Sequence, residues 1–596
     1  MRSPERVLNS LNEHSKDSSY KFERLYRLLF NEELFYVAYQ KIASNGGSTT
    51  KGSDGRSIDE MSLARIETLI ASLKDESYQP HPSRRVHIPK KNGKTRPLGI
   101  PAFEDKLVQE VVRMILEAIY EGHFETTSHG FRPKRSCHTA LLHIQKTFSG
   151  AKWFIEGDIK GFFDTIDHDV LVGILRERIS DDRFIRLIRK FLKAGYVEDW
   201  TFHNTYSGMP QGGIVSPILA NIYLDKLDKY VKEYIRHFDM GTKRRPGKES
   251  NDLTNERKRT VRKHGTEKAA LVARLKAIEQ ERAAFPSGDE MDGSYRRLKY
   301  IRYADDFILG VIGSKEDAQR IKEDIKSFLS ASLALELSEE KTLITHTGKS
   351  AKFLGYEITV TRDNHQRRDV RGRLRRTYGK RVRLNVSMAT LRDKLLEYGA
   401  MEIKLRNGKE VWKPKCRSGL IFNDDLEILD RYNRETVGFC NYYLIANNCV
   451  VLHNFRYIME YSMYKTFAGK YRSTVRKINK KYRLNKLFTV KYEQKGVIKS
   501  RTFYKTSFKR RTTAFNGSCD IEPYSIADVS RTNLTDRLKA EKCELCGATG
   551  KLIMHHVRNL KDLKGKESWE WLMSARRRKT IALCPSCHRL RHLGKV

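Results

Sequence analysis

Two adjacent acidic residues lie between apolar, β-prone runs in the stretch Tyr300-Ile-Arg-Tyr-Ala-Asp-Asp-Phe-Ile-Leu309. This pattern predicts a β-hairpin that displays carboxylates at its tip. A second apolar run, Trp153-Phe-Ile-Glu-Gly-Asp158, also ends in an acid. Phosphoryl transfer by two metal ions needs carboxylates from separate elements, gathered around ions about 3.5–4 Å apart. Together the segments predict such a site, with Asp158 and Asp305 as ligands and Asp306 in support; either segment alone is better explained by acids in ordinary turns.

The chain carries a large excess of positive charge: 114 Lys and Arg against 73 Asp and Glu, a formal net charge of +41. This excess predicts binding to a polyanion through many phosphate contacts, and nucleic acid is favoured over a membrane because no basic amphipathic anchor stands out. No stretch approaches the ~20 apolar residues that span a bilayer. The polar segment Met1 to Tyr20 lacks a secretory signal. We therefore expect a cytoplasmic protein with no membrane partner.

The length of 596 residues exceeds what one hydrophobic core supports, so three or four domains are expected. Residues 1–80 are predicted to be mostly helical, and strand-like and helix-like segments alternate to about 360, which predicts a mixed α+β domain. Residues 243–265 are polar and basic and predict a loop or insertion, followed by helical spacing over 267–285. Residues 385–480 predict helix again, and a basic, aromatic-rich segment covers 481–518.

The segments that flank the acidic pair occur in an order typical of one enzyme family. Tyr303-Ala-Asp-Asp306 resembles the box at the centre of reverse transcriptases. The other blocks of that resemblance are Arg85–Pro101, Ser128–Pro133, Asp158, Ser207–Pro217, Leu337–Thr342 and Phe353–Tyr356. The resemblance implies a right-hand polymerase fold with fingers and palm, and Mg²⁺ held by the three acids.

The resemblance also implies contacts to an incoming deoxynucleoside triphosphate. Fixed positive charge would be placed against the triphosphate by Lys91, Lys94 and Arg96. Without the resemblance, these residues would be interpreted as a solvated basic loop. Gln211 and the glycines Gly212 and Gly213 would let the backbone approach the base pair closely.

Phe163 lies five residues beyond Asp158, where the family places a bulky ring under the sugar to exclude a 2′-hydroxyl. Packing in a hydrophobic core is the competing explanation for this aromatic residue, and both explanations stay open.

A later segment resembles the helical thumb of group II intron proteins, which has maturase activity. It reads Arg431-Tyr-Asn-Arg-Glu-Thr-Val-Gly-Phe-Cys-Asn-Tyr-Tyr443. We expect an amphipathic helix with Arg431 and Arg434 facing outward to bind RNA, and aromatic residues that partly stack on RNA and partly pack the thumb core. Downstream, the mixture of basic and aromatic residues over 491–511 fits contacts to DNA or RNA.

Two close cysteine pairs near the end of the chain predict a structural zinc site. Cys543-Glu-Leu-Cys546 and Cys584-Pro-Ser-Cys587 match tetrahedral Zn²⁺ with four thiolates. Between the pairs lies His555-His556, and His588 follows the last cysteine. Zinc alone does not require these histidines, whereas a hydrolytic nuclease does, to activate water and to hold a divalent ion at the phosphate.

The Cys/His arrangement resembles HNH endonucleases, which implies that His556 is the general base and His588 a metal ligand, with the roles of His555 and His592 open. The family often has Asn just before the second cysteine pair, where this chain has Lys579. Asn559 substitutes for it, or the position is dispensable. A zinc knuckle that only grips DNA is the competing explanation.

The whole length resembles a group II intron-encoded protein. The resemblance implies three activities: RNA-directed DNA synthesis, help with splicing of its intron RNA, and nicking of target DNA to prime reverse transcription. Intron RNA, target DNA and deoxynucleoside triphosphates are the expected partners, a homodimer is possible, and the host is expected to be bacterial with an organelle left open. The alternative is a splicing maturase or RNA chaperone with a non-catalytic zinc tail, against which the intact acids argue.

The expected domains divide the chain into five parts. They are an N-terminal helical extension at 1–80, fingers and palm at 81–365 with a basic insertion at about 240–295, a maturase/thumb domain at 385–480, a DNA-binding segment at 481–530, and an HNH module of the ββα-metal type at 531–596.

Overall fold

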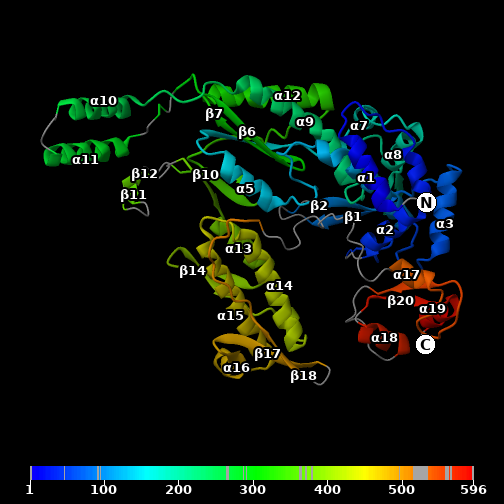
Figure 1. Cartoon of the computed structure of the whole chain (residues 1–596). Helices are drawn as coiled ribbons and strands as arrows, with labels where there is room; N and C mark the ends of the chain where they lie inside the picture. The colour runs from blue at the N-terminus through cyan, green and yellow to red at the C-terminus, as the bar shows by residue number, and fades with distance from the viewer. Residues whose placement is uncertain are drawn as a thin grey trace.

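A four-stranded antiparallel sheet of order β6-β7-β3-β8 forms the centre of the protein (Figure 1). The computed structural model describes residues 3–593 except 44, 46, 90–92, 94, 200, 264–267, 286–287, 290–291, 362–365, 369–371, 373, 377–379, 495–496, 515–533, 558–562, 564–566 and 577. Within those residues, no helix is long and apolar enough to cross a membrane. The strands of this palm sheet are β3 (Trp153–Asp158), β6 (Arg297–Tyr303), β7 (Asp306–Ile312) and β8 (Leu343–His346).

The palm sheet separates two hydrophobic cores, because successive side chains of a strand point to opposite faces. Phe307 and Leu309 of β7 pack into a core shared with the fingers, and Ile308 packs into a core shared with the thumb. Helices α9 (Ser216–Phe238) and α12 (Lys315–Leu333) cover the first face, and α5 (Cys137–Thr147) covers the second.

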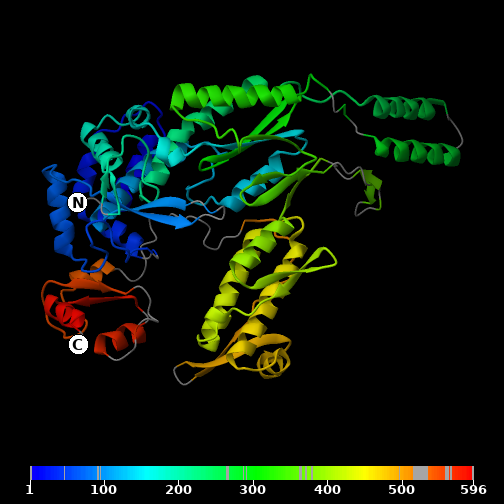
Figure 2. The same cartoon turned by 180° about the vertical axis from the view of Figure 1, so that it is seen from behind.

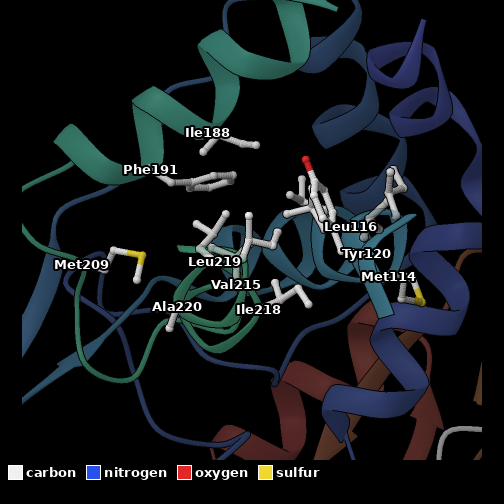
Figure 3. Packing of buried hydrophobic residues seen from close by; sticks show 14 of the residues in the cluster. Met114, Leu116, Tyr120, Ile188, Phe191, Met209, Val215, Ile218, Leu219 and Ala220 are labelled. Atoms are coloured by element: carbon white, nitrogen blue, oxygen red, sulfur yellow. The ribbon is translucent and has the colours of Figure 1, made fainter. Parts of the chain in front are cut away.

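The fingers combine helices from the N-terminal part of the chain with a sheet of order β2-β1-β4-β5. Figure 3 shows Ile188 and Phe191 of helix α8 (Asp182–Lys193) next to Leu219 of α9 and Val215, the residue before α9, in their common core. The first helices are α1 (Pro4–Ser15), η1 (Leu25–Phe30), α2 (Glu32–Ala43), α3 (Leu63–Lys74), α4 (Phe103–Tyr120) and η2 (Glu121–His123). The remaining elements are α6 (Phe162–Thr165), α7 (His168–Arg176), α8 (Asp182–Lys193), β1 (Ser83–Pro89), β2 (Thr95–Ile100), β4 (Tyr196–Glu198) and β5 (Thr201–His203).

The basic insertion is a pair of helices that projects from the palm, α10 (Lys248–Lys263) and α11 (Lys268–Ala284) (Figure 1). The prediction of a loop is therefore wrong for 248–263, whereas helix over most of 267–285 is observed. Helix α10 lacks an apolar stripe that would have indicated a helix. It pairs with α11 through charge instead, with Glu256 contacting Arg274 at 2.5 Å and Arg257 contacting Glu279 at 3.1 Å.

The thumb contains a β-hairpin at residues 401–414. The prediction that residues 385–480 are helical is therefore wrong for this stretch. Its turn is Asn407-Gly408, with positive φ at both residues, which is the signature of a type I′ turn. The helical elements are α13 (Met388–Glu397), η3 (Ser418–Leu420), α14 (Asp425–Tyr443), η4 (Cys449–Val451), α15 (Leu452–Lys470) and α16 (Val475–Tyr482). The strands from palm to thumb are β9 (Ala351–Phe353), β10 (Tyr356–Val360), β11 (Gln366–Arg368), β12 (Leu374–Arg376), β13 (Val382–Asn385), β14 (Met401–Arg406) and β15 (Lys409–Pro414).

The basic, aromatic-rich segment that follows the thumb packs onto it. Phe488, Val490, Phe503 and Phe508 are buried in the same core as the thumb helices. The outer strand of the segment is exposed along its whole length. Residues 483–508 are thus part of the thumb's packing and leave only their outer face for nucleic acid. The strands are β16 (Arg483–Leu484), β17 (Leu487–Gln494) and β18 (Val497–Thr502).

The C-terminal Cys/His module lies beside α2 and α3 of the fingers, far from them in sequence (Figures 1 and 2). It contains a two-stranded sheet flanked by helices, which is the ββα arrangement that the sequence predicts. Its elements are α17 (Leu534–Lys539), β19 (Ile553–His556), α18 (Ser568–Arg576), β20 (Thr580–Leu583) and α19 (Pro585–His592).

Candidate functional site

Three acidic residues meet at one end of the palm sheet. Strands β3 and β7 pair with Asp158 directly opposite Asp306, and Asp305 lies in the two-residue turn that joins β6 to β7. Ala304, the other turn residue, has a φ of 55°, which a residue with a Cβ rarely adopts. The hairpin with carboxylates at its tip is therefore observed, and its turn is held in an unfavourable backbone conformation by its surroundings.

Burial and repulsion between the carboxylates destabilise the ionised forms of Asp305 and Asp306. Burial, with the negative charges of Asp305 and Asp158, raises the pKa of Asp306 to about 7. Burial also raises the pKa of Asp305, and the positive charges of Arg96 and Lys341 oppose that rise. Carboxylate oxygens are hard ligands that suit Mg²⁺, and a divalent cation would relieve the repulsion. The residues present therefore fit a divalent metal.

Lys341 is a part of this site to which the sequence assigned no role. Its Nζ lies 2.8 Å from Asp158 Oδ2, and its side chain is 66% exposed. The residue belongs to the quoted block Leu337–Thr342, where Ser338 N donates to Asp158 O at 2.8 Å. The sequence block was therefore the available indication of a role for Lys341, because this hydrogen bond holds the block at the end of β3.

Arg302 anchors the catalytic turn from beneath, and the sequence did not identify it. Its guanidinium is fully buried, pairs with Asp228 of α9 at 2.5 Å, and donates to Ala304 O at 2.9 Å. It also donates to Ser128 Oγ at 2.8 Å and Asn221 Oδ1 at 3.2 Å. Every donor direction of the guanidinium is used to fix the hairpin to the rest of the palm. An arginine at an inward position of an apolar strand was the available signal.

The fingers sheet meets the loop before α9 at the predicted nucleotide-binding residues Arg96 and Gln211. Arg96 Nε donates to Gln211 Oε1 at 2.7 Å, and Gly99 N donates to Gln211 O at 2.7 Å. Gly212 has a φ of 119°, and a Cβ there would lie 2.4 Å from Gly99 O, so only glycine fits. The structure thus brings Arg96 and Gln211 together. Lys91 and Lys94 lie outside the described residues.

Phe163 is part of the hydrophobic core. Its ring is 8% exposed and makes an edge-to-face contact with Phe162, with centroids 5.2 Å apart. Its carbonyl accepts a hydrogen bond from Met209 N at 2.6 Å. Core packing accounts for the aromatic side chain, and a role in sugar selection stays a prediction.

Helix α14 presents its two predicted arginines to solvent. Arg431 and Arg434 are exposed, and Arg431 pairs with Glu435 at 2.5 Å. The aromatic residues Tyr432, Phe439 and Tyr443 are buried in the thumb core. These rings therefore pack the thumb, whereas the two arginines face solvent, and their contact with RNA stays a prediction.

The four predicted zinc ligands come together in the C-terminal module. The Sγ atoms of Cys543, Cys546, Cys584 and Cys587 all lie within 4.8 Å of one another. Cys584 N donates to Cys543 Sγ at 3.3 Å, the kind of second contact that stabilises a bound thiolate. The donor set and spacing fit tetrahedral Zn²⁺.

The module's histidines divide between two faces of β19. His555 lies with His588 and His592 of α19 in a second cluster, whose nitrogens lie within 4.8 Å of one another. His556 points the other way, as strand alternation requires, and its Nε2 lies 2.8 Å from Tyr39 OH. Burial lowers the pKa of His556 to about 3, which keeps the imidazole neutral.

The second cluster contains a residue that no sequence pattern identified. Asp59, from the loop before α3, lies within the same 4.8 Å as the three histidines. It is separated from His555 by 496 positions, so only the fold reveals it. Lys579, at the usual Asn position, has an exposed side chain and contributes its carbonyl to Val557 N at 2.9 Å. Asn559 lies outside the described residues.

Three family models match successive parts of the chain. Residues 88–251 and 275–358 match "Reverse transcriptase (RNA-dependent DNA polymerase)", residues 379–540 match "Type II intron maturase", and residues 543–588 match "AI2M/AI1M-like, HNH endonuclease". The maturase match extends over β16–β18, in agreement with their packing against the thumb.

The full-length relatives are proteins of introns. "Group II intron-encoded protein LtrA" of Lactococcus lactis subsp. cremoris is 44% identical over 594 residues, 98% of each chain. "Putative COX1/OXI3 intron 1 protein" of Saccharomyces cerevisiae is 32% identical and covers 99% of this chain and 70% of that one. "Uncharacterized 91 kDa protein in cob intron" of Schizosaccharomyces pombe is 36% identical, over 99% of this chain and 73% of that one.

The anchoring role of Arg302 predicts a large loss of stability for Arg302→Met. The change leaves the buried Asp228 carboxylate without its counter-ion and with only the Tyr300 hydroxyl donating to it, which costs about 3–5 kcal/mol and lowers the thermal midpoint by roughly 5–10 °C. Arg320→Met is the matched control, because Arg320 is 58% exposed and its ion pair with Asp317 is worth at most about 1 kcal/mol. Equal midpoints for the two variants in thermal unfolding would contradict the anchoring role.

The thiol cluster predicts that Cys543→Ser lowers the zinc content of the purified chain from about one equivalent to near zero, because four thiolates complete the shell. Cys416→Ser, outside the cluster, should keep the metal. Metal analysis by mass spectrometry measures both, and full zinc retention in Cys543→Ser would remove Cys543 from the ligand set.

Proposed function

The chain belongs to the group II intron-encoded proteins and combines reverse transcriptase, maturase and HNH endonuclease domains, and from this membership we propose which residues carry each activity. Asp158, Asp305 and Asp306 hold Mg²⁺ for RNA-directed DNA synthesis. The observation that carries this assignment is the pairing of Asp158 with Asp306, next to Asp305, in a buried setting that raises the pKa values of the latter two. When bound, Mg²⁺ would activate the primer 3′-hydroxyl and neutralise the triphosphate.

Positive side chains around the acids bind the deoxynucleoside triphosphate. Arg96, held by Gln211, faces the acids closely enough to affect Asp305 electrostatically. Lys91 and Lys94 precede it by a few residues in the sequence. Lys341 neutralises Asp158 in the absence of metal. Its exposed side chain is free to turn toward the triphosphate once a cation takes its place.

Intron RNA binds along the exposed face of the thumb. Arg431 and Arg434 of α14 lie on this face, and the exposed strand β18 adds further basic residues. Phosphate contacts of this kind account for a large part of RNA affinity and fit the net charge of +41. In this proposal the palm carries out DNA synthesis, and the surfaces of the fingers and thumb assist splicing.

The C-terminal module nicks target DNA to provide the primer end. Structural Zn²⁺ is held in one shell by Cys543, Cys546, Cys584 and Cys587. His555, His588 and His592 hold a separate divalent cation at the scissile phosphate, where it would stabilise developing negative charge. His556 is the general base, and its neutral imidazole can accept a proton from water.

Asp305→Asn tests the polymerase assignment. Loss of a metal ligand worth several kcal/mol should lower primer extension on an RNA template by about a thousandfold or more. RNA binding should survive because the basic surfaces are unchanged. Asp169→Asn is the matched control, since Asp169 is 81% exposed on the fingers. Extension by Asp305→Asn at the control's rate would refute the assignment and favour a splicing factor without polymerase activity.

His556→Ala tests the nuclease assignment. The change should lower DNA strand cleavage by about 10²–10⁴-fold, the usual contribution of a general base, with zinc content and primer extension unchanged. His237→Ala, at an 81% exposed surface position, serves as the control. Normal cleavage by His556→Ala would replace this role with that of a zinc knuckle that only grips DNA.

A further inference from the structure

The Asp59 carboxylate sits within the three-histidine cluster of the nuclease, although it comes from the fingers. Its Oδ1 accepts hydrogen bonds from His555 Nδ1 at 2.9 Å and from His556 N at 3.0 Å, and it lies 3.7 Å from His588 Nε2. Its Oδ2 lies 3.9 Å from His592 Nε2. One carboxylate of a distant domain thus faces all three imidazoles.

The histidine cluster has the features expected of a metal-binding site. Nε2 of His555 and Nε2 of His588 are buried and have no hydrogen-bond partner in the described part of the chain. The side chains of these two residues are only 1% and 6% exposed. Buried polar atoms are normally satisfied, so the unpaired nitrogens point to a cation that this cluster is built to hold.

A catalytic metal site keeps one position open for water or substrate, with three protein ligands filling the others. His555, His588 and His592 supply three ligands, and the oxygen of the DNA phosphate must take the open position. Asp59 places an anionic oxygen among the same three imidazoles. Asp59 and the three histidines would therefore give a cation four protein ligands. Such a closed shell is typical of structural metal sites and leaves no position for the phosphate.

The same surface of the fingers also covers the general base. His556 Nε2 lies 2.8 Å from Tyr39 OH of α2 in a buried contact, and His556 itself is only 8% exposed. A base in this position cannot reach a water molecule at the phosphate. Two separate groups that cleavage needs are therefore covered by one docking contact.

The loop that carries Asp59 is held firmly in place. Arg65 Nη1 donates to Asp59 O at 3.1 Å, and Arg65 Nε donates to Glu104 Oε1 at 2.7 Å. The next residue, Glu60, has a φ of 67°, a strained conformation for a residue with a Cβ. The carboxylate is thus presented to the module by a preformed loop.

The remaining docking contacts are both polar and apolar. Met554 N donates to Met61 O at 2.8 Å, Lys539 pairs with Glu33 at 3.1 Å, and Gln40 Nε2 donates to Thr535 Oγ1 at 3.3 Å. The side chains of Met61 and Met554 are buried in one hydrophobic cluster that both domains share. Interfaces between domains of one chain resemble transient protein–protein interfaces, and relative motion of such domains is common. The contact is therefore suited to release when a phosphate polyanion competes with Asp59.

We propose that the fingers hold the nuclease in a closed state, in which Asp59 occupies the position that the scissile phosphate needs and Tyr39 covers the base. The inference rests on the proposed nuclease roles of the histidines. DNA cleavage then requires the module to leave the fingers, so that polymerase and nuclease domains control each other through one carboxylate.

The test compares full-length Asp59→Asn with the wild-type chain. The substitution keeps the size of the side chain and removes its charge. A zero-length carbodiimide crosslink between Glu33 and Lys539, detected by mass spectrometry, reports docking without any activity. We expect the crosslink to decrease in Asp59→Asn, and to decrease in the wild-type chain when a DNA duplex is added.

The same preparations give the second readout, cleavage of a DNA duplex in Mg²⁺. Asp59→Asn should cleave about tenfold faster or more, because the closed population no longer competes. Asp54→Asn, in the same loop, is the matched control. Lys539→Glu should also accelerate cleavage, because the new carboxylate repels Glu33 and the substitution lies outside the metal site. Lys542→Glu is its control, since it makes the same change in charge at a neighbouring position.

The outcomes separate the inference from the function on which it rests. Equal cleavage by Asp59→Asn and the wild-type chain, with His556→Ala inactive, overturns the closed state alone. Slower cleavage by Asp59→Asn makes Asp59 a ligand that assists the reaction, which also overturns it. Absence of cleavage by every variant, while the crosslink responds to DNA, overturns the nuclease assignment and the closed state together.

Discussion

Asp158 faces Asp306 across the pair of strands β3 and β7, and Asp305 follows in the adjoining turn. This register brings acids from two distant segments into one buried group, at the cost of mutual repulsion. Arg302 makes the arrangement durable, because its buried guanidinium fixes the turn carbonyl and pairs with Asp228 of α9. The reverse transcriptase domain depends on this small set of contacts, since one step in register would turn the carboxylates to the wrong face of the sheet.

The palm sheet also connects the other domains to the chemistry. One face shares its core with the fingers, and the other shares its core with the thumb. A thumb packed on the sheet itself holds its exposed arginines in a fixed relation to the acids. The C-terminal module does not pack on the palm sheet and contacts the fingers instead (Figure 1), through Asp59, Tyr39, a few polar pairs and an apolar contact around Met61 and Met554. That contrast fits a rigid polymerase with a nuclease that can be released.

Local patterns in the sequence predicted the catalytic hairpin, the cysteine cluster and the outward arginines of α14, because each depends on neighbouring residues. The roles of Arg302 and Asp59 could not be predicted, since their partners lie 74 and 496 positions away. Helix α10 was missed because it has no apolar stripe, and its stabilising charges lie on α11. The thumb hairpin was missed although Asn407-Gly408 signalled it. Helical spacing in the surrounding sequence obscured this turn signal.

We infer that the acids of β3 and of the β6–β7 turn gather a divalent cation. Replacing Mg²⁺ by Fe²⁺ and adding ascorbate and peroxide generates radicals that cut the backbone beside the bound metal, and sequencing of the fragments locates the cuts. The account predicts cuts near Asp158 and near Asp305 and Asp306, which excess Mg²⁺ suppresses. Cuts confined to other parts of the chain, with both acidic segments intact, would contradict it.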